Sequence, residues 1–175
     1  MTLRAAAVII ATMPSQGSLA LVVAGAALAC NGGLAPTTCQ GICGTVHFRV
    51  PPPDSTQAAY VVAYHTFPRS RADLFTFQPP ITALRALPLG VDSAFYDAAV
   101  EPGRYEWVLA VWVKQGFTLA NADTTLRAAG FYRDPADTSR PGIVTVTAQG
   151  ASAIDFVIDF SQMSPPCRYY SPPCP

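Results

Sequence analysis

Cysteine thiols carry the most chemistry in this chain, because a thiol can form a disulfide, bind a metal or accept a lipid. The 175-residue sequence holds five of them: Cys30, Cys39, Cys43, Cys167 and Cys174. In an exported protein an odd number predicts that one cysteine has a role other than an internal disulfide. Cys30 is singled out by its position, because it ends an apolar run over residues 19–29 and precedes the polar stretch Asn31-Gly32-Gly33.

Residues 1–29 have the parts of a secretory signal peptide. An early cation, Arg4, precedes apolar residues, and the stretch Ala27-Leu28-Ala29 fits the A-x-A pattern of a cleavage site. The apolar runs are shorter than the roughly 18 to 20 residues that span a bilayer. We therefore expect an exported chain whose mature form begins at Cys30, with a transmembrane anchor as the alternative.

The residues around Cys30 also indicate how the chain is attached. Ala27-Leu28-Ala29-Cys30 resembles the lipobox of bacterial lipoproteins, with the leucine two residues before the cysteine, where that family has it three before. The resemblance implies a lipid on Cys30, the membrane as a partner and a place in the cell envelope. A soluble, extracellular form is the alternative.

A lipidated Cys30 leaves four cysteines, Cys39, Cys43, Cys167 and Cys174, and these predict two disulfides. Export leads to an oxidising compartment, where disulfides form and persist. Pairing of Cys39 or Cys43 with the C-terminal tail is favoured, and local pairing within each end is the rival. Zinc is disfavoured because Cys39-x3-Cys43 lacks the tight C-x2-C spacing of zinc knuckles, so we expect no metal and no cofactor.

Histidines and carboxylates give no catalytic pattern. His47 and His65 are the only two histidines, and the chain has neither a G-x-S-x-G nor an H-E-x-x-H motif. We expect both histidines at the surface and predict no catalytic residue. Asp134 and Asp137 share one loop, where they favour turns more than a calcium site.

Composition and charge limit the classes of protein to which the chain can belong. Eleven basic residues balance eleven acidic ones, so no basic stripe favours nucleic acid as a partner. The residues after the leader suffice for one domain. The expected organisation is a signal peptide (1–29), a flexible tether rich in Gly, Pro and Thr (30–43), a β-domain (44–162) and a Pro/Cys-rich tail (163–175).

Apolar residues of period two predict strands along the β-domain. The expected strands are 44–50, 58–67, 81–89, 93–100, 105–114, 143–148 and 154–160. Strands 58–67 and 105–114 are apolar on both faces, which places them centrally. One short helix is expected near 122–129, with Asn121 as its N-cap and Gly130 past its end. The tail is expected to be neither strand nor helix.

Seven short strands with turns between them predict an all-β, antiparallel, seven-stranded β-sandwich. Gly44-Thr45-Val46 and Gly103-Arg104-Tyr105-Glu106-Trp107 resemble the strand starts of transthyretin-like, carboxypeptidase-regulatory-like domains. The resemblance spans residues 44–160 and implies a non-enzymatic binding or structural module. A transthyretin-related hydrolase is one alternative, although the chain ends in Pro-Pro-Cys-Pro instead of that branch's tetrapeptide.

Aromatic residues mark the places where a partner could bind. Tyr169 and Tyr170 lie in the Pro-rich tail, where no core is expected, and we predict a contact surface there for a protein or carbohydrate partner. The strand aromatics, Trp107 among them, either pack in the core or line a groove. The remaining alternative is a subunit of an extracellular assembly built by strand addition.

Overall fold

The structure, a computed structural model, describes residues 39–169 and consists mostly of strands in small sheets. The predicted signal peptide, Cys30, most of the tether, Tyr170 and Cys174 lie outside the described residues. The strands are β1 (Ile42–Phe48), β2 (Thr56–Tyr64), β3 (Ser93–Ala98), β4 (Gly103–Tyr105), β5 (Trp107–Lys114), β6 (Leu126–Phe131), β7 (Val144–Val146) and β8 (Phe156–Ile158). The helical turns are η1 (Arg71–Phe75), η2 (Ile81–Ala83), η3 (Leu119–Asn121), α1 (Ala122–Thr125) and η4 (Pro166–Tyr169).

The strands form three sheets. The first has the order β3-β1-β8, the second β2-β5-β6, and β4 pairs with β7 in a third. The all-β class is therefore confirmed. The expectation of purely antiparallel strands is wrong at one place, because β1 and β8 run parallel, and the described residues form eight strands where seven were expected.

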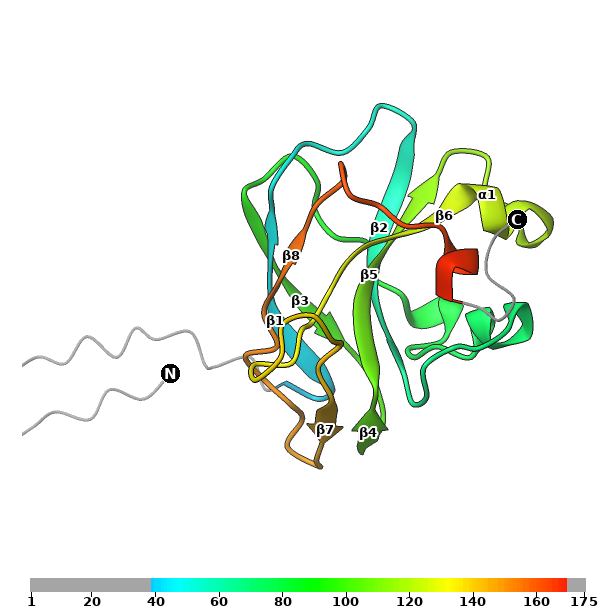
Figure 1. The fold of residues 1–175 in the computed structure, drawn as a ribbon. Helices are drawn as coiled ribbons and strands as arrows, with labels where there is room; N and C mark the ends of the chain where they lie inside the picture. The colour runs from blue at the N-terminus through cyan, green and yellow to red at the C-terminus, as the bar shows by residue number, and fades with distance from the viewer. Residues whose placement is uncertain (1–38, 170–175) are drawn as a thin grey trace, which may run out of the picture. The chain divides into compact units, whose positions relative to one another are not determined.

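The first and second sheets share one hydrophobic core. Alternate side chains of β2 and β5 point to the same cluster as those of β1 and β8, with Val46, Ala110 and Ile158 fully buried. Figure 1 shows β1, β3 and β8 as one layer and β2, β5 and β6 as the next. Each fully buried Val, Leu or Ile contributes about 1.5–3 kcal/mol, so this inner core is the main source of stability.

The edges of the second sheet are covered within the described part of the chain. On one side the Asp159 amide donates to the Ala129 carbonyl at 2.8 Å, which links the end of β8 to β6. Gly130 allows this approach, because a Cβ there would overlap the carbonyl oxygen of Val157. On the other side the residues after β2 fold back, and the Ala63 amide donates to the Gln78 carbonyl at 2.7 Å.

Three local expectations are corrected by the structure. The strand expected at 81–89 is instead the helical turn η2, followed by a single bridge between Ala86 and Tyr60. The helix expected at 122–129 ends at Thr125, because Leu126 begins strand β6 beside β5. The tail, expected to lack helix, forms the turn η4, which packs near β6.

The disulfide pairing follows the local alternative at the N-terminal end. Cys39 bonds Cys43, with their Cα atoms 5.9 Å apart, so the favoured pairing of either residue with the tail is wrong. The reason is position: Cys43 lies in β1 of the first sheet, whereas Cys167 lies in η4, whose contacts are with β6 of the second. Cys167 is also disulfide-bonded.

Candidate functional site: an apolar cavity on the second sheet

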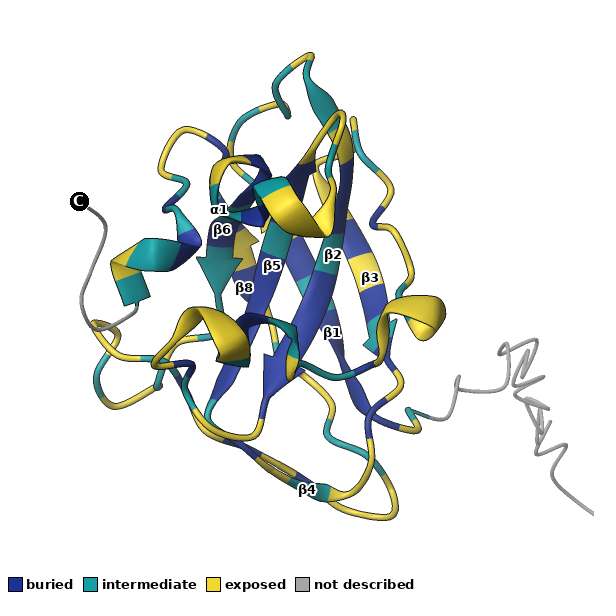
Figure 2. Cartoon of the chain, turned by 90° about the vertical axis from the view of Figure 1, so that its right-hand side faces the viewer, coloured by how far each residue is buried: buried dark blue, intermediate teal, exposed yellow. Residues whose placement is uncertain are grey.

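The outer face of the second sheet, turned away from the shared core, bears a cavity of about 290 Å³. Its floor is built from the second apolar face of β2 and β5, and Figure 2 looks onto this side of the sheet. The floor residues are Tyr60, Val62, Tyr64, Trp107, Leu109, Val111, Val113, Leu126 and Ala128. Strand alternation makes this floor, because the neighbouring residues of β2 and β5 point into the inner core.

A cover segment, residues 65–92 between β2 and β3, closes much of the cavity. Its apolar side chains over the cavity are Pro68, Leu74, Phe75, Phe77, Ile81 and Leu84. The Tyr64 hydroxyl donates to the Leu74 carbonyl at 2.7 Å, and the Gln78 amide donates to the Ala63 carbonyl at 2.8 Å. These bonds fix the irregular cover to the regular strand beneath it.

A capping box starts η1, the turn that brings Leu74 and Phe75 over the cavity. The Asp73 carboxylate accepts from the backbone amides of Arg69 and Ser70, both at 2.9 Å, and from the Ser70 hydroxyl. These hydrogen bonds, first that from the Arg69 amide, lower the pKa of the Asp73 carboxyl. The Asp73 carboxylate thus accepts three hydrogen bonds at the start of the turn that lies over the cavity.

Three aromatic residues that line the cavity, Tyr64, Trp107 and Tyr169, form a cluster with Phe67. The Trp107 ring centroid lies 4.8 Å from those of Phe67 and Tyr169 and 5.6 Å from that of Tyr64. Tyr169 belongs to η4, so two segments distant in the sequence meet here. Trp107 is 3% exposed, and its Nε1 atom has no hydrogen-bond partner within the described residues.

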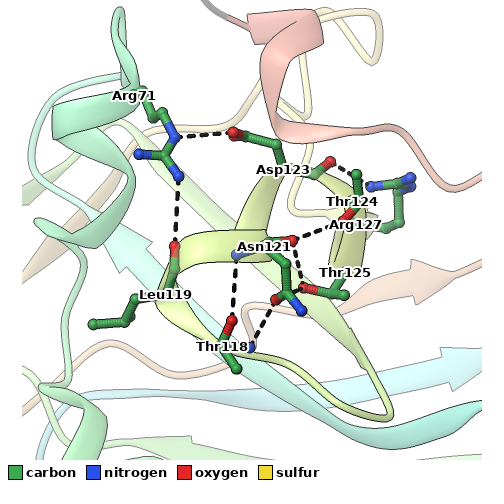
Figure 3. A network of polar contacts seen from close by, with 8 residues as sticks. All are labelled: Arg71, Thr118, Leu119, Asn121, Asp123, Thr124, Thr125 and Arg127. Atoms are coloured by element: carbon green, nitrogen blue, oxygen red, sulfur yellow. Dashed lines mark hydrogen bonds and ion pairs between the residues drawn. The ribbon is translucent and has the colours of Figure 1, made fainter.

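Another part of the cavity lining flanks α1 in the sequence. Phe117 and Leu126 belong to it, and the polar network in Figure 3 holds the turn next to them. In that network Arg71 of η1 pairs with Asp123 of α1 at 2.9 Å, and the Asn121 amide donates to the Thr118 hydroxyl. The ion pair thus joins the cover segment to the chain after β5.

Arg127 is the one charged residue among those at the cavity wall. It alternates with Leu126 and Ala128, which pack into the outer clusters, so its side chain leaves the sheet on the opposite side. Its guanidinium donates to the carbonyls of Asp123 and Leu126 at 2.9 and 2.7 Å. The cavity lining is therefore mostly apolar, and its one charged residue already donates to main-chain carbonyls.

A second hollow, of about 560 Å³, lies along β6 and β8 and has a different character. Charged residues line it, among them Arg49, Arg133, Asp155 and Asp159. Arg49 lies 3.9 Å from Asp159, and the Arg133 guanidinium stacks over the Phe131 ring. The apolar cavity is the better candidate for a ligand site. A ligand there would be buried among apolar side chains, whereas a ligand in the second hollow would have to separate charged groups that already have partners.

The structure separates the aromatic residues considered in the sequence. Tyr169 lines the apolar cavity together with Trp107, while Tyr170 lies outside the described residues. Tyr105 and Trp112 are buried in the inner core, where the Trp112 Nε1 donates to the Thr56 hydroxyl at 2.7 Å. A groove lined by all the strand aromatics is therefore not formed.

The histidines and the loop carboxylates lie away from the cavity. His47 is exposed on β1, and His65 is exposed just after β2, where it stacks on Tyr105 at 4.2 Å. They belong to different sheets, and neither lines the two hollows described above. The turn-forming role of Asp134 and Asp137 is confirmed, because each carboxylate accepts from the backbone amide two residues on.

One group of metal-ligand type occurs among residues 39–169. Cys39, Cys43 and Asp97 place ligand atoms within 4.8 Å of one another. The two sulfurs are joined in the disulfide, so they offer no thiolate to a metal.

The sequence did contain a signal for the cavity that period-two patterns alone do not capture. Strands β2 and β5 are apolar on both faces, so each face must be covered. The cover segment carries several large apolar side chains between prolines, and period-two analysis alone predicts only the strand 81–89 within it. A loop with that many apolar residues, beside strands with a spare apolar face, indicates a covered surface.

Comparison of the chain with protein-family models, with curated proteins and with solved structures gave no match. The transthyretin-like resemblance and the lipobox therefore stay predictions from short motifs. No helix within residues 39–169 has the length and apolarity needed to cross a membrane.

Proposed function

We propose that this protein is a non-enzymatic binding module of the bacterial cell envelope, anchored through a lipid on Cys30, that holds a small apolar molecule on its second sheet. The observation that supports the proposal is the cavity of about 290 Å³. It is about twice the 150 Å³ cavity known to hold benzene, and it lies near the lower end of the size range of ligand sites, about 300–1,000 Å³.

The physical basis of binding is transfer of apolar surface out of water. Each Å² of apolar ligand surface buried there contributes about 25 cal/mol. The cover segment is already fixed by the Tyr64–Leu74 and Ala63–Gln78 hydrogen bonds. A preformed site loses little conformational entropy on binding, so even a ligand without polar groups is expected to bind.

Equilibrium dialysis with naphthalene tests this proposal on the mature protein. We expect saturable binding by the wild type and at least a tenfold loss in Ala128→Phe, because Ala128 lies on the cavity floor. The matched control is Ala136→Phe, on an exposed loop, which should bind as the wild type does. Near-ultraviolet circular dichroism confirms that the variants are folded. Absence of saturable binding, or equal binding by all three proteins, contradicts the proposal.

The lipid anchor has a separate test. The full chain is expressed in a bacterial host, and the protein recovered from membranes is measured by intact mass spectrometry. We expect a mass that begins at Cys30 with acyl chains attached, and Cys30→Ser should be released from the membrane fraction. More than one acyl chain is needed for stable anchoring. An unmodified N-terminal thiol on the mature protein contradicts this part of the proposal.

The transthyretin-like sandwich type is likewise part of the proposal. Its support is that Gly44 lies in the first strand and that Gly103–Tyr105 (β4) directly precedes the long strand β5, as in the motifs of that family. The parallel β1–β8 pair is a departure from it. An experimental structure with the same strand order as a transthyretin-like domain would support the assignment, and a different order would remove it.

Assembly by strand addition is a second candidate, favoured by strand β3. Within the described residues β3 pairs only with β1, and Phe95 on it is 59% exposed. An open edge of this kind can accept a strand from another chain. Sedimentation over a concentration series should show self-association that Phe95→Asp abolishes. A monomer at the highest concentration contradicts this candidate.

A further inference from the structure

The indole nitrogen of Trp107 is a buried donor without a partner. Trp107 lines the cavity and is 3% exposed, yet its Nε1 makes no hydrogen bond to any described residue. Buried tryptophan N–H groups usually have a partner. The protein's second tryptophan follows that rule, because Trp112 Nε1 donates to the Thr56 hydroxyl at 2.7 Å.

The surroundings of Trp107 restrict what such a partner can be. An indole N–H can only donate, so the missing group is an acceptor. The cavity lining contains no carboxylate, and the one cation at its wall, Arg127, donates to main-chain carbonyls. A charged ligand would lose its hydration in a mostly apolar cavity whose one cation already has partners, which favours an uncharged acceptor.

The aromatic cluster adds a second feature. The ring centroids of Phe67, Trp107 and Tyr169 lie within 4.8–5.8 Å of one another, and Trp107 and Tyr169 both line the cavity. Aromatic rings gain energy from offset or edge contacts with a further ring beyond the area that they bury. A planar ring is thus the shape that best uses this part of the cavity.

We propose that the ligand is an uncharged ring compound with a hydrogen-bond acceptor, a carbonyl or ether oxygen, which accepts from Trp107 Nε1 while its ring packs beside Tyr169. This inference rests on the proposed function and names the ligand class of the same cavity. Because Nε1 is itself buried, the proposal requires that neighbouring side chains shift slightly on binding, so that the indole N–H reaches the ligand.

Three matched probes test the inference. 2-Acetonaphthone has a ring and a carbonyl acceptor, 2-ethylnaphthalene has no acceptor, and 2-naphthoate has a charged one. By equilibrium dialysis we expect the wild type to bind 2-acetonaphthone about fivefold more tightly than 2-ethylnaphthalene, the preference that one net hydrogen bond provides. 2-Naphthoate should bind most weakly.

The two tryptophans provide the variant and its control. Trp107→Phe removes the donor at the cavity and should abolish the preference for 2-acetonaphthone while 2-ethylnaphthalene still binds. Trp112→Phe removes the inner-core indole and should keep the preference. If Trp107→Phe fails to fold, the wild type still gives an answer in a ¹H–¹⁵N spectrum. Of its two indole signals, that of Trp107 should move downfield with 2-acetonaphthone and not with 2-ethylnaphthalene.

The outcomes separate this inference from the proposed function. Equal affinity for the two neutral probes, with no downfield shift of the Trp107 indole signal, overturns the inference and leaves the apolar binding site standing. Preference for 2-naphthoate also overturns it. If none of the probes binds saturably, both the proposed function and the inference fall.

Discussion

Both faces of the second sheet are apolar, and they are covered in different ways. The inner face of β2 presents Ala59, Val61 and Ala63 to the first sheet, and all three are buried in one continuous core. The outer face presents larger side chains, Tyr60 and Tyr64 among them, to helical turns and loops. The inner face packs against the first sheet in the shared core, whereas the outer face retains a cavity of about 290 Å³.

The difference shows how the regularity of the covering element controls packing. Side chains on two sheets alternate with the same period, so small residues on one can interdigitate with larger ones on the other. The cover segment has no such period, because η1 and η2 are short turns joined by loops. Protein interiors are normally packed as densely as organic crystals, so a cavity retained under a tethered cover is the feature on which the proposed binding function rests.

The largest expected effect on the free energy of unfolding comes from removing a large side chain from the inner face. Trp112→Ala should lower the free energy of unfolding by about 3–5 kcal/mol, because Trp112 is buried in the core and also bonds the Thr56 hydroxyl. Urea unfolding monitored by far-ultraviolet circular dichroism measures the change. A loss of under about 1 kcal/mol would show that the inner face is not the tighter of the two.

Two alanines of the same sheet give the sharpest comparison. Ala110→Leu adds volume to the filled inner core and should cost about 1–3 kcal/mol. Ala128→Leu adds the same volume to the cavity floor and should leave the free energy of unfolding unchanged or raised. Both alanines are buried, at 0% and 9% exposure, so burial alone does not distinguish them. Equal destabilisation in urea unfolding would contradict the contrast between the faces.

A smaller effect is expected from the capping carboxylate of the cover. Asp73 has a pKa lowered below 3.8 by hydrogen bonds from the Arg69 amide and the Ser70 hydroxyl. Its stabilising effect is therefore complete above about pH 3.8 and disappears as the pH falls through the lowered folded-state pKa. Asp73→Ala should be less stable than the wild type at neutral pH, and the difference should vanish in acid.

Ligand binding can test whether Asp73 supports the cover over the outer face. Asp73→Ala should weaken naphthalene binding at neutral pH, because η1 carries Leu74 and Phe75 over the cavity. Asp137→Ala is the matched control, since the Ser139 hydroxyl lowers the pKa of Asp137 in the same way and Asp137 lies outside the cavity lining. Its binding should be unchanged. A uniform loss in both variants would mean that the cover does not depend on its cap.

The smallest effect is expected for the ion pair that joins η1 to α1. Arg71 and Asp123 lie 2.9 Å apart with side chains 54% and 40% exposed. Exposed pairs contribute about 0.2–1 kcal/mol, so Arg71→Ala should change unfolding within that range and less so at high salt. A loss above about 2 kcal/mol would show that the cover is a structural part of the core.

Much of the strand pattern could be predicted because it depends on local alternation. The expected strands around β1, β2, β3 and β5 agree with the structure to within a few residues. The segment expected as a helix over 122–129 was divided by tertiary context, since Leu126 and Ala128 pair with Val113 and Val111 of β5. A short apolar stretch suits either element, and a neighbouring strand decides between them.

The candidate site was less accessible to prediction. Tyr169 was expected to contact a partner from outside any core, and the structure places it in the aromatic cluster beside Trp107. The pairing of Cys39 with Cys43 was the second choice. Both results depend on which side of the sheets the tail follows, and no local pattern in the tail contains that information.

By itself, the sequence determined the all-β class, the central place of β5 and the apolar character of both faces of β2 and β5, whereas the central place expected for β2 was wrong because β2 is an edge strand of the second sheet. These properties follow from side-chain period and polarity, which act between residues close along the chain. Only the tertiary structure decided the parallel β1–β8 pair, the covering of one face by loops and the cavity with the unpartnered Trp107 Nε1. A cavity is a misfit between segments distant in the sequence, so it exists only once those segments have packed.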